Sequence, residues 1–564
     1  MTRSARSSEG RAEIGRRRYG SGIDARSLRE DTAVPFQSPF ADVEIPDVSV
    51  YDYLFSGLTD DELGRVAVFD SATNAETTYG DLRARIDAFA GALAARGIKP
   101  GDVVALHCPN TAAFVIAFHG ILRAGATATT INSLYTPPEI ANQLRDSGAI
   151  RYVTVSPLLP GAMAGCAEVG LGQEHVIVLD GAEGHESMMD LLSEGAPAPE
   201  VSIDPATHLA VLPYSSGTTG KAKGVMLTHR NLVANVQQSL TAIQERSDDV
   251  VLAVLPFFHI YGMNVIMSLT LKVRAKLVTM PRFDLGDFLR LIHEQRISFL
   301  YIAPPMAVAL AKHPAVDDID TSSVRAVLSG AAPLDEALGQ AVKKRLGCGM
   351  QQGYGMTELS PVSHALPLDR DDISIGSVGM AVANVEFKVV DPGTGEEIDA
   401  VPGGRTAPGE LWVRGPNVMV GYLGNDEATR ETIDADGYLH TGDIVEVGPE
   451  GEVYVVDRLK ELIKYKGYQV PPAELEAVLL THPAIADSAV VPHPDEDAGE
   501  VPHAFVVLQE GATLTAEEVM AYVGEKVAPH KKIRVVDFIP VIPKSASGKI
   551  LRKDLKGKTA SDFS

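Results

Sequence analysis

Apolar and polar residues alternate along most of the chain with two periods, one typical of helices and one typical of buried strands. Residues 78–93 predict an amphipathic helix, because the apolar positions recur at helical spacing: Leu82, Ile86, Phe89, Ala90 and Leu93. Residues 103–107 form a short, mainly apolar run that predicts a strand, and residues 112–124 predict the next helix. This alternation begins at Tyr51 and predicts parallel sheets covered by helices on both faces.

The alternation restarts near the C-terminus as a separate, smaller unit. Strand-like residues 453–456 lead into residues 458–466, where four basic residues fall within nine positions, and roughly a hundred residues of α+β pattern follow. A solvated charged face is the ordinary interpretation of such a basic segment. We nevertheless place a domain boundary at Arg458, and predict an N-terminal domain over residues 34–457 and a C-terminal domain over residues 458–564.

Residues 1–33 lack the pattern of either element. They are rich in Arg, Ser and Gly and poor in large apolar residues, which predicts a disordered extension. They contain five acidic residues, too many for a transit peptide, and no apolar stretch of the secretory type.

Composition narrows the functional classes. At 564 residues the chain exceeds the size of a single hydrophobic core, and its mean hydropathy near zero indicates a soluble globular protein. A net charge of −24 argues against nonspecific binding to nucleic acid and against attraction to anionic membranes. Cys108, Cys166 and Cys348 are widely spaced without a metal-ligand pattern, which favours buried thiols in a reducing cytoplasm.

The strongest candidate for chemistry is the glycine-rich segment 214–225. It contains three glycines, five hydroxyl side chains and two lysines within its first eleven residues, and it follows a predicted strand at 208–213. We interpret residues 226–232 as the entry to a helix. Glycine admits close backbone approach and lysine supplies charge, so the segment predicts phosphate binding. Its spacing is not that of a Walker A loop, and a flexible surface loop is the alternative.

The apolar segment 250–271 is a second candidate. Pro256, His259 and Asn264 interrupt it, so it lacks the uninterrupted apolar span of a membrane helix. We predict a strand over residues 250–255, a functional loop over residues 256–262 and then a helix. A core histidine with satisfied hydrogen bonds is the alternative interpretation of His259.

Three further turns combine small residues with polar or aromatic ones, at residues 303–305, 328–334 and 352–358. Such turns are expected where the backbone passes close to a flat ligand. Tyr354 could stack on a nucleobase, Thr357 could donate to a phosphate and Glu358 could hold Mg²⁺ through oxygen. Near the end of the chain, residues 543–550 form another glycine- and serine-containing turn that presents Lys549. Each could be an ordinary turn, but their number and order favour a binding site.

The segment 215–224 resembles the phosphate-loop signature of the acyl-adenylate-forming superfamily, Ser-Ser-Gly-Thr-Thr-Gly-x-Pro-Lys-Gly, with Ala222 in place of the usual proline. The other motifs of that superfamily follow in order over roughly residues 50 to 555. Within it, the chain is most similar to 4-coumarate–CoA ligases, particularly the bacterial cinnamate/coumarate–CoA ligases. The segments that carry this likeness are residues 255–261, 329–334, 353–358, 460–467 and 544–549.

The resemblance implies an α/β fold. A large N-terminal domain of layered sheets and helices would end in a small barrel-like subdomain, and a small α+β C-terminal lid would rotate between two half-reactions. In the first, a carboxylate attacks the α-phosphate of Mg-ATP and yields acyl-AMP and pyrophosphate. In the second, the thiol of coenzyme A attacks the acyl carbon and AMP leaves. Phosphoryl transfer of this kind depends on positioning and charge neutralisation.

The resemblance also implies a role for each matching residue. Lys549, His259 and Lys464 would act on the carboxylate and phosphate, Glu358 would bind Mg²⁺, and Lys460 would be the hinge. Residues that would bind ATP or AMP are Ser215, Ser216, Gly217, Thr218, Thr219, Lys223, Gly330, Ala331, Gln352, Gly353, Tyr354, Thr357, Asp443 and Arg458. Residues that would line the acyl pocket are Ile260, Tyr261, Asn264, Leu328, Gly330, Ala331, Gly353, Gly355, Pro361 and Val362. Lys272, Lys466 and Gly467 would contact coenzyme A.

Rival functions stay open at this point. A medium- or long-chain fatty acyl–CoA ligase is the principal alternative, because an aliphatic tail also requires an apolar pocket. A carrier-protein-loading enzyme and a luciferase-like oxygenase would share the motifs, and a noncatalytic nucleotide-binding regulator would be expected to lose Lys549 or Glu358. We expect a cytoplasmic monomer or homodimer that acts on small molecules, with no nucleic-acid partner and no membrane insertion.

Overall fold

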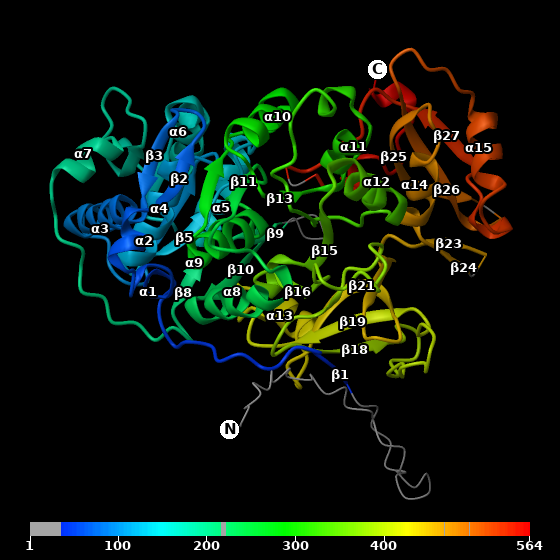
Figure 1. The fold of residues 1–564 in the computed structure, drawn as a ribbon, viewed down its shortest axis with the longest axis horizontal. Coiled ribbons are helices and arrows are strands. Elements are labelled where there is room, and N and C mark those ends of the chain that lie inside the picture. Colours follow the sequence, from blue (N-terminus) through cyan, green and yellow to red (C-terminus); the bar gives the residue numbers. More distant parts are fainter. Residues whose placement is uncertain (1–34, 216–221, 467, 496, 547, 564) are drawn as a thin grey trace, which may run out of the picture. The chain divides into compact units, whose positions relative to one another are not determined.

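The computed structural model describes residues 35–215, 222–466, 468–495, 497–546 and 548–563 (Figure 1). The extension predicted over residues 1–33 lies outside these ranges. So do Ser216, Gly217, Thr218, Thr219 and Gly467 among the predicted site residues.

One sheet of the large α/β part carries the predicted phosphate-binding segment. Its strand order is β20-β10-β8-β5-β4-β6-β7, with β9 paired to β10. The strands from β8 to β7 are parallel, whereas β10 is antiparallel to β8, β9 and β20. The bounds are β4 Val103–His107, β5 Thr127–Thr130, β6 Arg151–Thr154, β7 Val176–Val178, β8 Leu209–Val211, β9 Tyr214–Ser215, β10 Lys223–Thr228 and β20 Gly421–Tyr422.

The second sheet carries four of the ten predicted acyl-pocket residues, Leu328, Gly353, Gly355 and Val362. Its order is β17-β16-β15-β14-β13-β11-β12-β2-β3, and the strands from β15 to β2 are parallel. The bounds are β2 Val66–Asp70, β3 Ala75–Thr78, β11 Val250–Ala253, β12 Lys276–Thr279, β13 Phe299–Ile302, β14 Ala326–Ser329, β15 Gly349–Gly355, β16 Val362–Ala365 and β17 Met380–Ala381. Parallel strands with helical crossovers are therefore confirmed in both sheets.

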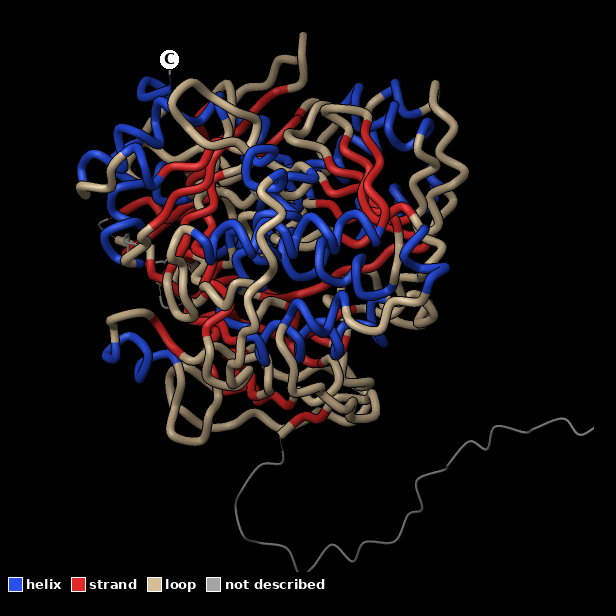
Figure 2. Tube along the Cα trace, turned by 90° about the vertical axis from the view of Figure 1, so that its left-hand side faces the viewer, coloured by secondary structure: helices blue, strands red, loops and turns tan. Residues whose placement is uncertain are grey.

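Helices lie between and outside the two sheets, as Figure 2 shows. Helices α4 and α8 contact strands of both sheets, so they form the layer between them. The helices of the large part are α1 Val50–Phe55, α2 Asp60–Gly64, α3 Tyr79–Ala95, α4 Ala112–Arg123, α5 Pro137–Ser147, α6 Leu159–Glu168, α7 Met188–Ser193, α8 His229–Ile243, α9 Leu269–Val273, α10 Leu285–Glu294, α11 Pro304–Lys312, α12 Glu336–Leu346 and α13 Asp426–Thr432.

Local sequence explains where two of these helices begin. Thr78 caps α3 by accepting a hydrogen bond from the backbone N–H of Asp81, and the five apolar positions predicted for this helix are all buried. The predicted entry to a helix at residue 226 is wrong in its first three residues. Residues 226–228 belong to β10, and the helix begins at His229, where Thr228 and Asn231 form a capping box.

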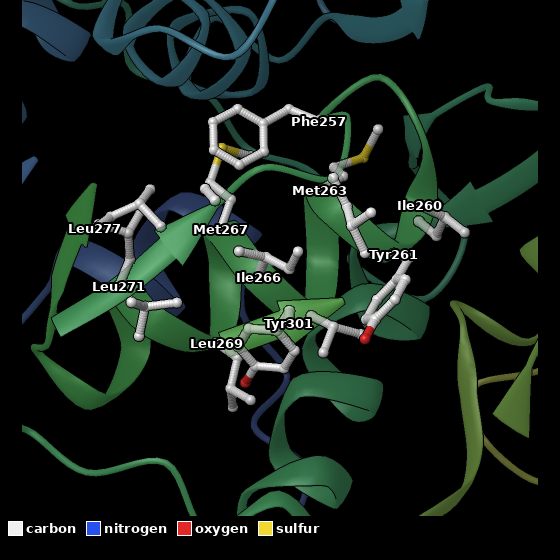
Figure 3. Packing of buried hydrophobic residues seen from close by; sticks show 14 of the residues in the cluster. Phe257, Ile260, Tyr261, Met263, Ile266, Met267, Leu269, Leu271, Leu277 and Tyr301 are labelled. Atoms are coloured by element: carbon white, nitrogen blue, oxygen red, sulfur yellow. The ribbon is translucent and has the colours of Figure 1, made fainter. Parts of the chain in front are cut away.

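The predicted loop at residues 256–262 is also shorter than expected. A π-helical segment, Tyr261–Ser268, begins before the loop was predicted to end, and α9 continues it. All eight π-helical residues are buried, and Figure 3 shows several of them packed with residues of β12 and β13. π-Helical turns are frequent at functional sites because they shift side chains out of the α-helical register.

An antiparallel sheet follows at the end of the large part, with order β1-β18-β19-β21-β22. Its bounds are β1 Phe36–Gln37, β18 Glu386–Val390, β19 Gly409–Arg414, β21 Leu439–Val447 and β22 Val453–Arg458. It occupies the place of the predicted barrel-like subdomain, and the pairings of the described strands form an open path rather than a closed ring.

The C-terminal part has its own α+β sheet and core. The order is β24-β23-β26-β25, with β27 paired to β26. The bounds are β23 Ile463–Tyr465, β24 Tyr468–Val470, α14 Pro472–Leu480, β25 Ile485–Asp495, β26 Gly499–Leu508, α15 Ala516–Gly524 and β27 Val535–Phe538. The core of the large part extends to Val453 and the next core begins at Ile463. A boundary at Arg458 falls between them and stays a prediction.

Two global features bear on chemistry. None of the helices among the described residues is both long enough and apolar enough to cross a bilayer. All three cysteines are free and buried, and burial raises the pKa of the Cys108 and Cys166 thiols to about 12 and that of Cys348 to about 11. The interpretation of these thiols as buried side chains is confirmed.

Candidate functional site

The ends of the glycine-rich segment are held together by a short hairpin. Ser215 in β9 pairs with Lys223 in β10, so the chain on either side of residues 216–221 leaves from one point of the sheet. The Tyr214 hydroxyl donates to Asp146 Oδ2 at 2.6 Å and anchors β9 to α5. Of the predicted phosphate-binding residues in this segment, the structure therefore places Ser215 and Lys223.

Tyr422 connects Lys223 with the predicted metal ligand Glu358. The Tyr422 hydroxyl donates to Glu358 Oε1 at 2.9 Å, and Lys223 Nζ lies 4.5 Å from the centre of the Tyr422 ring. Burial and the adjacent Glu358 raise the pKa of Tyr422, so its hydroxyl stays a donor. Sequence reasoning missed Tyr422, because it lies in a β20 segment without a motif.

Glu358 fits a magnesium site of the kind that the substrate completes. It is buried, and the described residues contain no group of three or more His, Cys, Asp or Glu side chains that could hold a metal alone. Mg²⁺ in nucleotide sites is commonly bound by one or two carboxylates together with phosphates and water. The structure thus provides one suitable carboxylate, and Tyr422 contacts both this carboxylate and the ammonium of Lys223.

Tyr354, Asp443 and Arg458 form a second group, from three strands. The Tyr354 hydroxyl donates to Asp443 Oδ2 at 2.6 Å, and Arg458 Nε lies 3.4 Å from Asp443 Oδ1. Asp443 and Arg458 are cross-strand neighbours in β21 and β22. Burial raises the pKa of Asp443, whereas Arg458 and Tyr354 act in the opposite direction. These contacts orient the Asp443 carboxylate, which can accept two hydrogen bonds from a diol.

Gln352 supports the turn at Gly330 rather than extending into open space. Its side-chain amide donates to the Leu334 carbonyl at 2.9 Å and accepts from the Leu334 N–H at 3.1 Å. Ala331 in this turn has φ +69°, a conformation that L residues rarely adopt. The structure thus shows Gln352 as a buried support for the predicted nucleotide turn, with Thr357 at the start of the Glu358 turn.

Glycines bring the predicted acyl-pocket residues close together. A Cβ atom at Gly330 would lie 3.0–3.1 Å from atoms of the Tyr261 ring, whose hydroxyl donates to the Leu328 carbonyl at 3.5 Å. At Gly355 a Cβ atom would lie 2.2 Å from the Pro361 carbonyl oxygen. A side chain at Gly355 would overlap this carbonyl, whereas one at Gly330 would require the Tyr261 ring to move slightly. Gly353, Ile260 and Val362 adjoin the same group, with a Cβ at Gly353 3.8 Å from Leu328 Cδ2.

The polar groups of this pocket are largely occupied by the protein. Asn264 is buried, and its amide nitrogen donates to the carbonyls of Leu232 and Ser360, at 3.2 and 2.8 Å. A ligand would therefore meet at most the carbonyl oxygen of Asn264. Leu328, which is 3% exposed, adds apolar surface beside Tyr261.

Lys549 reaches the large part of the molecule from the C-terminal turn. A Cβ atom at Gly548 would lie 3.2 Å from Ala303 Cβ, so the turn packs against the start of α11. Burial lowers the pKa of Lys549 to about 8, Arg458 adds to this effect, and Glu461 and Asp443 oppose it. Burial also lowers the pKa of His259 to about 4, with a further contribution from Lys549. A neutral His259 therefore lies near Lys549, which joins the group around Asp443.

The structure does not place the remaining predicted lysines with the group around Lys549. Lys464 and Lys466 are exposed on and beside β23, and within the described part the charged group that shifts the pKa of His259 is Lys549 rather than Lys464. Lys272 Nζ lies 3.7 Å from the centre of the Tyr53 ring and donates to the Tyr53 carbonyl. Lys460 is exposed in the turn after β22. The coenzyme A contacts and the hinge stay predictions.

Comparisons with known proteins identify the family. Two family models match the chain, "AMP-binding enzyme" over residues 59–423 and "AMP-binding enzyme C-terminal domain" over residues 474–549. A 4-coumarate–CoA ligase 5 from Oryza sativa subsp. japonica is 44% identical, over 93% of this chain and 97% of the rice protein. A 4-coumarate–CoA ligase 2 from Nicotiana tabacum is 42% identical, over 93% and 97%.

Solved structures of ligases and related enzymes have a similar fold over most of the chain. ATP-bound MatB from Rhodopseudomonas palustris has a TM-score of 0.82 and 30% identity, covering 92% of this chain and 100% of that one. The anthranilate CoA ligase AuaEII in complex with anthranoyl-AMP has a TM-score of 0.82 and 27% identity, covering 90% and 97%.

Proposed function

The chain belongs to the AMP-binding enzyme family, and from that premise we propose that it is an AMP-forming ligase that converts a phenylpropenoic acid to its coenzyme A thioester. The observation that carries this proposal is the near full-length likeness to 4-coumarate–CoA ligases. The superfamily and the large and small α/β parts predicted from sequence are thereby confirmed. Similarity to the bacterial ligases in particular stays a prediction, since both relatives described above are plant enzymes.

In the first half-reaction, the substrate carboxylate attacks the α-phosphate of ATP and expels pyrophosphate. We assign Lys549 to the carboxylate and the phosphate oxygens, where its ammonium neutralises charge that builds in the transition state. The neighbouring His259 is uncharged and adds no repulsion to Lys549. Mg²⁺ bound through Glu358 and the phosphates would neutralise further charge. Ser215 to Thr219 and Lys223 are assigned to the phosphates.

The adenosine part of ATP has separate contacts. Gly330, Ala331 and Tyr354 would lie against adenine, and the fixed Asp443 carboxylate with Arg458 would bind the ribose hydroxyls. Such fixed contacts convert binding energy into orientation of the α-phosphate, which is the main contribution that an enzyme makes to this chemistry.

In the second half-reaction, the thiol of coenzyme A attacks the acyl carbon, and AMP leaves. We propose that rotation of the C-terminal part about Lys460 withdraws Lys549 and brings Lys466, Gly467 and Lys464 toward the site. Lys272 is a further proposed contact for coenzyme A, once its ammonium leaves the Tyr53 ring. The protein would act in the cytoplasm, as a monomer or homodimer.

The acyl pocket favours a planar, apolar group. The Tyr261 ring and the Pro361 carbonyl occupy the space that side chains at Gly330 and Gly355 would take, and Leu328 and the occupied donor groups of Asn264 leave little to pair with a phenolic hydroxyl. Burying an unpaired hydroxyl costs about 1–3 kcal/mol. We therefore propose that unsubstituted cinnamate is a substrate at least comparable with 4-coumarate.

The test is pyrophosphate release with cinnamate, 4-coumarate, anthranilate and decanoate, each with and without coenzyme A. The expected result is pyrophosphate release with the phenylpropenoic acids, and thioester and AMP only when coenzyme A is present. A higher kcat/KM for decanoate than for both phenylpropenoic acids would favour the fatty acyl–CoA ligase. Pyrophosphate release without any thioester would indicate a different acceptor.

A further inference from the structure

We propose that Glu461, held in place by Arg552, is a positioning residue that keeps Lys549 in its charged form during acyl-AMP formation. This inference rests on the proposed function of Lys549. We assign Glu461 no direct contact with the proposed substrates. It acts through the charge and the placement of the Lys549 ammonium.

Arg552 is the centre of a carboxylate cluster formed by Glu461, Glu476 and Asp457. Its guanidinium forms ion pairs with Glu461 through Nη1 and with Glu476 Oε2 through Nη2, the latter at 2.6 Å, and Nε donates to the Val490 carbonyl at 3.2 Å. The Arg552 side chain is 12% exposed, and those of Glu461 and Glu476 are 17% and 10% exposed. Ion pairs this well shielded and hydrogen-bonded hold a defined geometry, unlike exposed pairs.

The cluster connects the segment after the Lys549 turn with the turn after β22 and with α14. Arg552 follows the Lys549 turn, which is closed by hydrogen bonds from Ser545 N–H to the Lys549 carbonyl at 2.8 Å and from Leu551 N–H to the Pro543 carbonyl at 2.9 Å. Glu461 belongs to the turn after β22, where its N–H donates to the Arg458 carbonyl at 2.9 Å. Asp457, on the other side of Lys460, accepts from the N–H of Ala473 in α14 at 2.9 Å.

The charges that face Lys549 come from four elements. Arg458 on β22 and Arg552 after the turn disfavour the ammonium, whereas Glu461 and Asp443 on β21 favour it, and the nearby His259 is neutral. Asp443 is already shared between Tyr354 and Arg458. Among the carboxylates, Glu461 has the larger effect on the pKa of Lys549. Without Glu461, burial and the two arginines would lower the pKa of Lys549, and of these two carboxylates Asp443 alone would raise it.

The test is the pH dependence of acyl-AMP formation in wild type and Glu461→Gln, measured as cinnamate-dependent pyrophosphate release. The reactive form of Lys549 is the ammonium, so the rate should fall as pH rises through its pKa, which is about 8 in wild type. Removing one negative charge disfavours the ammonium. We expect the alkaline limb to move to lower pH by about one unit, because nearby opposite charges shift a pKa by about 1–3 units. The rate lost at pH 7.5 should return at pH 6.

Two variants control this experiment. Glu474→Gln removes a carboxylate of α14 that pairs with Lys531 at 2.6 Å, away from the Arg552 cluster, and should leave the pH profile unchanged. Glu461→Asp keeps the negative charge, so the alkaline limb of its pH–rate profile should lie close to that of wild type. It also provides a folded variant if Glu461→Gln fails to fold. Thioester formation from supplied acyl-AMP should be unchanged in all variants.

Three results would contradict the inference: an unmoved limb in Glu461→Gln, an equal loss in both half-reactions at every pH, or no rescue by Glu461→Asp. If wild type releases no pyrophosphate with any acid, the proposed function itself fails. The pKa of Lys549 is then measured directly, from the pH dependence of its acetylation by acetic anhydride, followed by peptide mass spectrometry. An equal Lys549 pKa in wild type and Glu461→Gln would overturn the inference independently of activity.

Discussion

The acyl pocket and the Lys549 turn are held by different kinds of interaction. In the acyl pocket, neutral amides and small residues set the geometry: Asn264 bonds two carbonyls, and Gly355 admits the Pro361 carbonyl. The Lys549 turn is closed by backbone hydrogen bonds and is followed by a charged cluster, in which Arg552 pairs with Glu461 and Glu476. Hydrogen bonds between neutral groups do not depend on pH over the physiological range. The net charge of a cluster of buried ionisable groups can change over that range.

Under the proposed function, this difference would make the acyl pocket the constant part of the site and the Lys549 turn the part that can be switched. A pocket that selects a planar acid must keep one shape through both half-reactions. A lysine required in only one half-reaction must be able to leave, and ion pairs can exchange partners more readily than a packed core can deform. Each of the following variants tests one side of this comparison.

The largest effect is expected from Lys549→Ala. Loss of a charge-stabilising donor from a site shielded from water costs about 3 kcal/mol, so acyl-AMP formation should slow about 100- to 1,000-fold. Thioester formation from supplied acyl-AMP should largely survive. The exposed Lys553→Ala is the matched control. Equal loss in both half-reactions would show that Lys549 does not belong to a switchable region.

A slightly smaller effect is expected from Lys460→Pro, which restricts φ where the proposed rotation requires freedom. Acyl-AMP formation should persist, and thioester formation from supplied acyl-AMP should fall about tenfold to 100-fold. Lys460→Ala, which keeps a flexible backbone, should behave like wild type. Rapid-quench measurements of the rates of both half-reactions in the two variants and in wild type test this prediction. An unimpaired thioester step in Lys460→Pro would argue against rotation at this residue.

An intermediate effect is expected from Tyr422→Phe. The substitution removes the hydroxyl that donates to Glu358, and a hydrogen bond to a charged group contributes about 1.5–3 kcal/mol. Acyl-AMP formation at limiting Mg²⁺ should decrease about tenfold, with partial recovery at high Mg²⁺. Tyr522→Phe, at a hydroxyl on the C-terminal part that contacts Thr481, should change nothing. A Mg²⁺ dependence equal to that of wild type would remove Glu358 from the proposed metal site.

The smallest effect concerns the acyl pocket. The kcat/KM of cinnamate should equal or exceed that of 4-coumarate by a few-fold. The ratio should not vary between pH 6 and 8, because Asn264 and Tyr261, which form the hydrogen bonds described for this pocket, are neutral over this range. Replacing Leu328 by glutamine would supply a donor and should shift the ratio toward 4-coumarate. A pH-dependent ratio, or a ratio unaffected by Leu328→Gln, would contradict the description of this pocket as neutral and apolar near Leu328.

Periodicity predicted the α/β layers well, because apolar spacing reports which face of an element is buried. It failed where tertiary contacts decide. Residues 226–228 pair with β8 and β20, so they continue a strand although a helix follows immediately. The π-helical start at Tyr261 depends on close approach of Gly262 to Pro256, where a Cβ atom would lie 2.1 Å from the Pro256 carbonyl oxygen. No local period indicates such an approach.

The site shows the same division. Tyr354 was predicted because small-residue turns are expected where the backbone bends around a ligand, whereas Asp443 and Lys549 were assigned their roles from the family resemblance, and all three roles stay predictions. Tyr422, Glu461 and Arg552 were missed, since their roles arise from contacts between segments that are distant in sequence. Tyr422 meets Glu358 from a separate strand, and Arg552 meets Glu476 across the C-terminal part. A single sequence contains no signal that pairs such residues.

The burial of Cys108, Cys166 and Cys348 has a practical consequence for every experiment proposed above. With thiol pKa values of about 11 to 12, these side chains carry almost no thiolate at neutral pH. Coenzyme A is then the dominant reactive thiol in an assay mixture without added reductant. A chromogenic disulfide reagent should therefore report the consumption of free coenzyme A directly, with little background from the folded protein, and a rise in that background would serve as a sensitive sign that a variant has begun to unfold.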